Sequence, residues 1–227
     1  MPRRAIGAAS SHPLLAGAPR RAIMRMQPAC AAGSFASSGP SGWAAGPFGS
    51  LMQMRLETNL ERIENLASQR ENANWAFRCF LKGSSLSSGR IDSIVHRHYR
   101  AVAAQIDCRH CANCCRAVRP LLKIGDIRRL ALHLNMSEDQ FATAYLVQGE
   151  SGEGHSFRSL PCPLLKENLC TVYPHRPADC RSFPHVHKKD FVFRITQAWS
   201  NCSVCPIVFN VFELLKRDLW RERKSNY

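Results

Sequence analysis

The stretch from Cys108 to Cys115 constrains this chain more than any other feature, because it places four thiols in eight consecutive residues. Its pattern is Cys-x-x-Cys-x-x-Cys, with one more cysteine directly after the third. A two-residue gap lets a tight turn point both sulfurs at one ion, which is why this gap recurs in structural zinc sites and in iron–sulfur sites. The stretch therefore predicts half of a metal site.

Disulfides, metal ligands and inert buried thiols are the three interpretations of the cysteines. The chain has 227 residues and 11 cysteines, and a chain of this length buries a core without help from disulfides. An odd total, an adjacent pair and the lack of a recognisable secretory leader disfavour a disulfide framework. Inert thiols have no reason to recur at two-residue gaps. Metal ligands are therefore expected among the cysteines between residues 108 and 205, which are Cys108, Cys111, Cys114, Cys115, Cys162, Cys170, Cys180, Cys202 and Cys205.

The net charge of +14 is concentrated at the two ends of the chain. Residues 1–56 contribute +6 and residues 216–224 contribute +3, which leaves only +5 for the segment between them. Metal-bound thiolates would cancel that remainder, so a basic surface for nucleic acid is not established. No run of 18 apolar residues occurs, and a transmembrane helix is not expected.

Composition and periodicity divide the chain into four parts. Residues 1–50, rich in Ala, Gly, Ser, Pro and Arg, are expected to be a disordered leader or a mis-called extension of the reading frame. Residues 51–105 form a helical N-terminal segment, residues 106–205 a cysteine-cluster metal-binding domain, and residues 206–227 an amphipathic basic helix. The expected location is the cytoplasm, or an organelle if the leader is a transit peptide.

The expected fold is mainly α, with an irregular, turn-rich cysteine core, so that a small α+β metal-binding domain is flanked by helices. Apolar spacing predicts one helix over residues 56–82 and a second over 91–104, in which His96 and His98 are interpreted as solvated. Five prolines between residues 161 and 184 exclude a long helix there. Residues 191–195 are expected to form a short strand.

Cys114 and Cys115 are adjacent, and successive side chains diverge. Both sulfurs therefore cannot easily reach one tetrahedral centre, which indicates either two metals or one multinuclear cluster. At least one four-cysteine site is expected, and it would hold an iron–sulfur cluster or Zn2+, since thiolates accept zinc, iron–sulfur clusters and copper(I). Arg176 and Arg181 are expected to lie beside the thiols, where positive charge lowers thiol pKa values and offsets an anionic site.

Four ordered sequence elements carry a family resemblance. They are the octet itself, Cys-Pro-Leu-Leu from residue 162, Cys-x-Val-Tyr from residue 170, and Arg-Pro-x-x-Cys-Arg-x-Phe-Pro from residue 176. Over about residues 106–205 the chain resembles the YkgJ-like cysteine-cluster family (CxxCxxCC) of zinc- or iron-chelating proteins. The resemblance implies ligands among Cys108, Cys111, Cys114, Cys115, Cys162, Cys170 and Cys180, while Cys202 and Cys205 fit a more variable later group.

The leading functional hypothesis is a metal-binding protein that acts in redox chemistry, metal handling or assembly. Its partners would be the metal ion or cluster and a protein substrate or assembly partner. An iron–sulfur-dependent modification enzyme is the alternative, because flagellin lysine N-methylases carry a similar cysteine domain. A nucleic-acid-binding zinc module is less favoured. No Gly-x-Gly-x-x-Gly, P-loop or His-Glu-x-x-His motif occurs, so no catalytic residue is assigned and enzymatic activity stays open.

Overall fold

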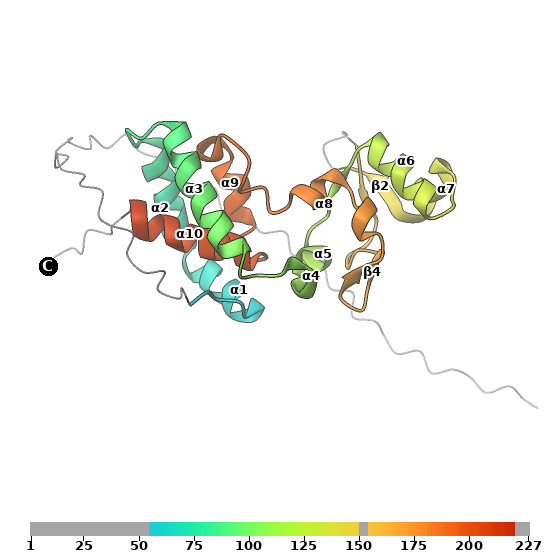
Figure 1. Cartoon of the computed structure of the whole chain (residues 1–227), viewed down its shortest axis with the longest axis horizontal. Coiled ribbons are helices and arrows are strands. Elements are labelled where there is room, and N and C mark those ends of the chain that lie inside the picture. Colours follow the sequence, from blue (N-terminus) through green and yellow to red (C-terminus); the bar gives the residue numbers. More distant parts are fainter. Residues whose placement is uncertain (1–54, 150–153, 221–227) are drawn as a thin grey trace, which may run out of the picture. The chain divides into compact units, whose positions relative to one another are not determined.

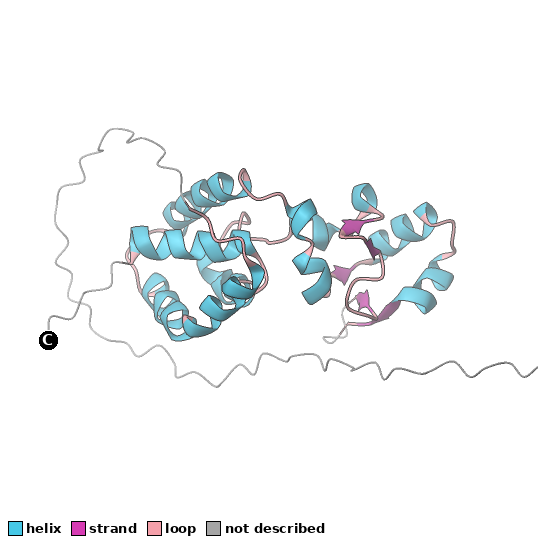
Figure 2. Ribbon diagram, turned by 90° about the horizontal axis from the view of Figure 1, so that it is seen from below, coloured by secondary structure: helices cyan, strands magenta, loops and turns pink. Residues whose placement is uncertain are grey.

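The computed structural model of the chain describes residues 55–149 and 154–220, and Figure 1 colours them by position in the sequence. Helices dominate these residues, and the strands are all two or three residues long (Figure 2). The expected fold class, mainly α with a small α+β part, is confirmed. The expectations for residues 1–50 and for the basic end after residue 220 lie outside the described residues.

Five helices share the first of two hydrophobic cores: α1 (Leu60–Gln69), α2 (Glu71–Lys82), α3 (Ser88–Ala103), α9 (Phe191–Ser200) and α10 (Pro206–Leu219). Phe77, Phe191 and Phe212 are fully buried there and meet through edge contacts. α10 packs along α3, as the red and green helices of Figure 1 show. Between Pro206 and Lys216, ten of the eleven residues are buried and only Glu213 is half-buried, so α10 is nearly surrounded by its neighbours.

Polar caps fix where these helices begin. The Asn59 side chain accepts a hydrogen bond from the Arg62 N–H at 2.8 Å and starts α1. The Ser87 hydroxyl accepts one from the Arg90 N–H and starts α3. Such caps satisfy N–H groups that have no partner within the helix. The predicted continuous helix over residues 56–82 is wrong, since the structure interrupts it at Arg70.

Asp92 joins α3 to α9. Its carboxylate, 8% exposed, accepts hydrogen bonds from the N–H groups of Asp190 at 2.7 Å and Phe191 at 2.9 Å. These are N–H groups at the start of α9, where negative charge is also favourable. The strand expected at residues 191–195 is therefore wrong, because burial at Phe191, Ile195 and Ala198 follows helical spacing and tertiary context overrides β propensity.

The expected solvent exposure of His98 is also wrong. His98 is only 6% exposed, and its Nε2 lies 2.9 Å from the Asp218 carboxylate of α10. Burial lowers the pKa of His98 more than Asp218 and its hydrogen bond raise it. His96 is half-buried, and the sequence alone does not show that His98 meets Asp218 of α10.

The second core is smaller and lies under α6 (Ile124–His133) and α7 (Glu138–Tyr145). It includes a sheet of β1 (Leu121–Leu122), β2 (Leu146–Gln148) and β3 (His155–Phe157), with β3 central and both neighbours antiparallel to it. Ser156 is the shared register point, opposite Leu121 on one side and Val147 on the other. Ser137 and Gln140 form a capping box at the start of α7.

The remaining elements are short and carry most of the cysteines. They are α4 (Cys108–Cys111), α5 (Asn113–Ala117), the hairpin of β4 (Leu165–Lys166) and β5 (Leu169–Cys170), the 3-10 turn η1 (Tyr173–His175) and α8 (Ala178–Ser182). None of these is long enough to be stable alone. No helix in the described part of the chain is both long and apolar enough to cross a membrane.

Removal of the Asp92 carboxylate tests the link between α3 and α9. We expect Asp92→Ala to lower the free energy of unfolding by about 2 to 3 kcal/mol, because two N–H groups lose a charged acceptor. Urea denaturation measures this change. Ser93→Ala, an exposed position on the same helix, is the control and should change stability by less than about 0.5 kcal/mol. Equal unfolding midpoints for the Asp92 variant and the unmodified chain would contradict this role.

Candidate metal centre

Eight of the nine cysteines between residues 108 and 205 line one cavity of about 560 Å3. All nine are free thiols. The cavity cysteines come from five separate segments of the chain, and they are Cys108, Cys111, Cys114, Cys115, Cys162, Cys170, Cys180 and Cys205. The structure thus brings together residues up to 97 positions apart in the sequence.

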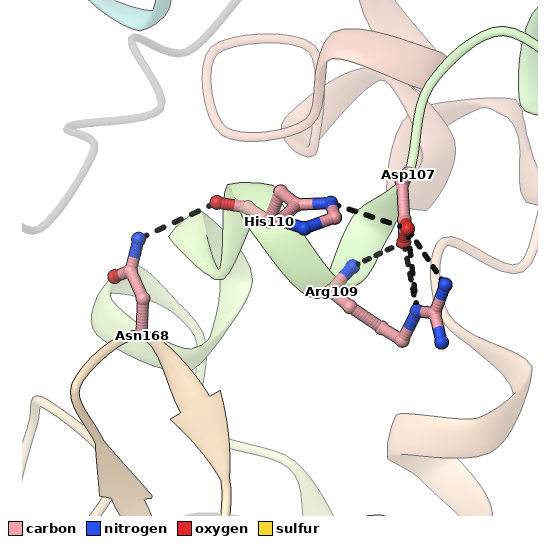
Figure 3. Close-up of polar contacts among 4 residues, drawn as sticks. All are labelled: Asp107, Arg109, His110 and Asn168. Carbon is pink, nitrogen blue, oxygen red and sulfur yellow. Dashed lines mark hydrogen bonds and ion pairs between the residues drawn. The ribbon is translucent and has the colours of Figure 1, made fainter.

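Asp107 builds the turn that presents Cys108 and Cys111 (Figure 3). Its carboxylate accepts a hydrogen bond from the Arg109 N–H at 2.9 Å, binds the Arg109 guanidinium, and lies 3.2 Å from His110 Nδ1. The hydrogen bonds from Arg109 hold the pKa of Asp107 well below its usual range. Ala112 then adopts a left-handed conformation (φ 47°), which turns the chain from α4 into α5.

Cys162 lies shortly before the β4–β5 hairpin, and Cys170 is the last residue of its second strand. Glu167 and Asn168 have φ values of 48° and 68°, the signature of a two-residue hairpin turn with left-handed residues at both positions. The Asn168 side chain donates a hydrogen bond to the His110 carbonyl oxygen (Figure 3), and the Cys162 N–H donates to the Cys115 carbonyl oxygen at 2.8 Å. The hairpin is thereby joined to the cysteine octet at two points.

Two carboxylates anchor α8 and its Cys180. Asp126 of α6 accepts a hydrogen bond from the Ala178 N–H at 3.0 Å, and Asp179 accepts one from the Leu121 N–H at 3.0 Å. Asp179 also lies 3.3 Å from His185 Nε2. These hydrogen bonds, made by the two residues that directly precede Cys180, hold Cys180 against the second core.

Cys202 and Cys205 have different positions despite their two-residue gap. Cys205 lines the cavity directly before α10, and the Asn113 side chain donates a hydrogen bond to the neighbouring Val204 carbonyl oxygen at 2.7 Å. Cys202 is 3% exposed within the first core and is absent from the cavity lining. Burial raises the pKa of Cys202 well above its usual value. The structure therefore does not bring Cys202 to the other predicted ligands.

The cavity is a poor environment for isolated thiolates. Burial is the main reason that the pKa of Cys162 is raised to about 11 and the pKa values of Cys180 and Cys205 to about 12. Cys115 is different, because a hydrogen bond from the Cys114 thiol lowers its pKa. The same hydrogen bond raises the pKa of Cys114.

Arg176 is the cation placed among these thiols. Its guanidinium stacks 3.7 Å above the Tyr173 ring, and its Nε is buried with no hydrogen-bond partner among the described residues. Burial raises the pKa of Cys108 and Cys170, and the Arg176 charge offsets part of that rise. Arg181 also lines the cavity, but its side chain is exposed.

Sequence reasoning did not identify the residues that hold the cysteines in place. Asn113, Asp126 and Asp179 each make a long-range hydrogen bond that positions a cysteine-bearing segment. Asp126 is recognisable from the sequence only as a residue near a helix start, and Asp179 only as a neighbour of Cys180. Their partners lie 91, 52 and 58 positions away, so no local pattern reveals these contacts.

The donor set fits a thiophilic metal. Thiolates select zinc, copper(I) and iron–sulfur clusters over calcium and magnesium, and Arg176 supplies a buried N–H that faces this sulfur-rich surrounding. As they stand in the structure, no three Cys, His, Asp or Glu side chains of residues 55–149 and 154–220 are gathered tightly enough to hold an ion.

Comparison with protein families agrees with the site. Residues 107–206 match the model of the CxxCxxCC family, which is described as "Putative zinc- or iron-chelating domain". Comparisons with curated proteins and with solved structures gave no match. The matched range confirms the resemblance carried by the octet and by the blocks at residues 162, 170 and 176. Over residues 107–206, this chain is therefore similar to the CxxCxxCC family of zinc- or iron-chelating domains.

Proposed function

We propose that this chain is a metal-binding protein that holds zinc or an iron–sulfur cluster on its cavity cysteines and acts in metal handling or redox chemistry. The observation that carries the proposal is the set of eight free thiols, from five segments, that face one cavity. No disulfide framework explains this arrangement, because all eight thiols are free. Free thiols also favour a reducing compartment, so we propose the cytoplasm as the location.

The raised pKa values of Cys162, Cys180 and Cys205 favour a metal-binding role over a nucleophilic role for these three thiols. A buried thiol that resists ionisation is a weak nucleophile. A metal ion changes this balance, because it binds the thiolate and displaces the proton. Thiols that line a cavity without being drawn together are compatible with such a site, since metal binding and ordering of its ligands are coupled.

Arg176 would support the bound metal electrostatically. Sites with four thiolates around a divalent ion carry net negative charge, and a nearby guanidinium offsets it. The stack on Tyr173 holds the Arg176 guanidinium in place, which reduces the entropy lost when the metal site forms. Arg181 would contribute less, because its exposed charge is screened by water.

A cluster-dependent modification enzyme is the second candidate. The specific observation is the size of the cavity, since about 560 Å3 falls within the range of small-molecule sites. Tyr99, Phe157 and Phe183 are among the apolar residues that line it beside the cysteines. If the chain is such an enzyme, its substrate would be a protein, as for the protein methylases that carry a similar cysteine domain. Release of a modified peptide by the reconstituted protein would support it, and turnover equal to a metal-free control would exclude it.

Metal removal should destabilise the protein. A ligand present at about a thousand times its dissociation constant stabilises the folded state by about 4 kcal/mol. For a chain of this size, we expect chelation under reducing conditions to lower the melting temperature by about 10 °C. Differential scanning calorimetry measures the change, and readdition of zinc should restore it. The same melting temperature with and without metal would contradict a structural metal site.

Substitution of Arg176 and of Arg181, two of the arginines that line the cavity, should have unequal effects on zinc affinity. We expect Arg176→Gln to weaken zinc affinity about tenfold, because it removes a positive charge that acts on Cys108, Cys115 and Cys170 together. Arg181→Gln, the matched control at the exposed edge of the cavity, should change affinity much less. Competition with a chromogenic chelator measures both values. Equal losses of zinc affinity in the two variants would show that the charge of Arg176 supports the bound metal no more than that of Arg181.

A further inference from the structure

We propose that the cavity holds two metal sites, one on each side of the Cys114–Cys115 pair. This inference rests on the proposed function, because it concerns how the same thiols are divided. The first thiol group consists of Cys115, Cys162, Cys170 and Cys180. The second thiol group consists of Cys108, Cys111, Cys114 and Cys205.

The two hydrophobic cores hold different cysteines. Cys162 and Cys170 pack against the second core, and Cys180 lies in α8, which Asp179 joins to β1 of the same core. Cys205 belongs to the first core and is 6% exposed. Cysteines that are anchored in separate cores cannot all shift toward one point without disturbing the packing of one core.

Hydrogen bonds join the cysteine octet to segments that belong to both cores. The Cys162 N–H donates to the Cys115 carbonyl oxygen at 2.8 Å, which holds Cys115 beside the first thiol group. The Asn113 side chain donates to the Val204 carbonyl oxygen at 2.7 Å, which holds the start of α5 beside Cys205. Both contacts are made by α5, so this helix lies at the boundary between the groups.

The geometry of α5 separates its adjacent cysteines. Consecutive side chains on a helix point roughly 100° apart, so the side chains of Cys114 and Cys115 leave α5 in different directions. The hydrogen bond from the Cys114 thiol to Cys115 keeps the two sulfurs close together at the boundary between the groups. Cys115 therefore completes the first thiol group, and Cys114 remains for the second. Two adjacent cysteines are difficult to place around one tetrahedral ion. They can instead each bind a different metal when two sites lie side by side.

Cobalt(II) titration of the reduced, metal-free full chain tests the division. Cobalt bound to four thiolates is coloured, and metal analysis after desalting gives the number bound. We expect two equivalents for the unmodified chain, one for Cys180→Ser and one for Cys111→Ser. The Cys111→Ser/Cys180→Ser double variant should bind none tightly. Cys202→Ala is the matched control and should still bind two.

Three results would overturn the division. One equivalent for the unmodified chain would show a single site, as would loss of all cobalt from either single variant. Binding of two equivalents by the double variant would show that these thiols are not the ligands. Absence of cobalt binding by the unmodified chain would instead overturn the proposed function itself. Cys170→Ser and Cys108→Ser provide a second variant pair, and circular dichroism checks that every variant is folded.

Discussion

The hydrogen bond from the Cys162 N–H to the Cys115 carbonyl oxygen joins the cysteine octet to the second half of the metal centre. The short elements that carry these residues bury too little apolar surface to hold their own positions. They depend instead on polar contacts with longer elements, such as Asp126 of α6 with the Ala178 N–H. The two hydrophobic cores therefore act as rigid supports, and the cysteines lie on turns fastened to them. Turns bring side chains from several directions to one place, which a polydentate metal site requires.

This arrangement places thiols where their anionic form is costly without a cation. Burial raises most of the cavity thiol pKa values, and Arg176 offsets the rise only in part. A bound metal would supply the missing positive charge and would satisfy the sulfur atoms at the same time. Binding of a metal by the cavity thiolates would therefore both stabilise the turns that carry the cysteines and determine the affinity of the protein for the metal.

The sequence predicted the chemistry better than it predicted the geometry. The Cys-x-x-Cys gaps and the four sequence blocks of the resemblance are local features, and the comparison with protein families confirms that resemblance. The difference between Cys202 and Cys205 is not local. The two cysteines belong to one Cys-x-x-Cys pair. Only Cys205 lines the cavity, whereas Cys202 is buried in the first core, to which α10 also belongs. The helix at Phe191–Ser200 depends similarly on Asp92, which lies about a hundred positions away in the sequence.

The most direct measurement is X-ray absorption spectroscopy of the metal in the full-length, anaerobically purified chain. Ligation by the cavity cysteines predicts four sulfur neighbours per metal atom, at about 2.3 Å if the metal is zinc. Histidine and carboxylate side chains do not line the cavity, apart from Asp179, so nitrogen and oxygen neighbours are not expected. A shell dominated by nitrogen or oxygen atoms would contradict a thiolate site at this place in the fold.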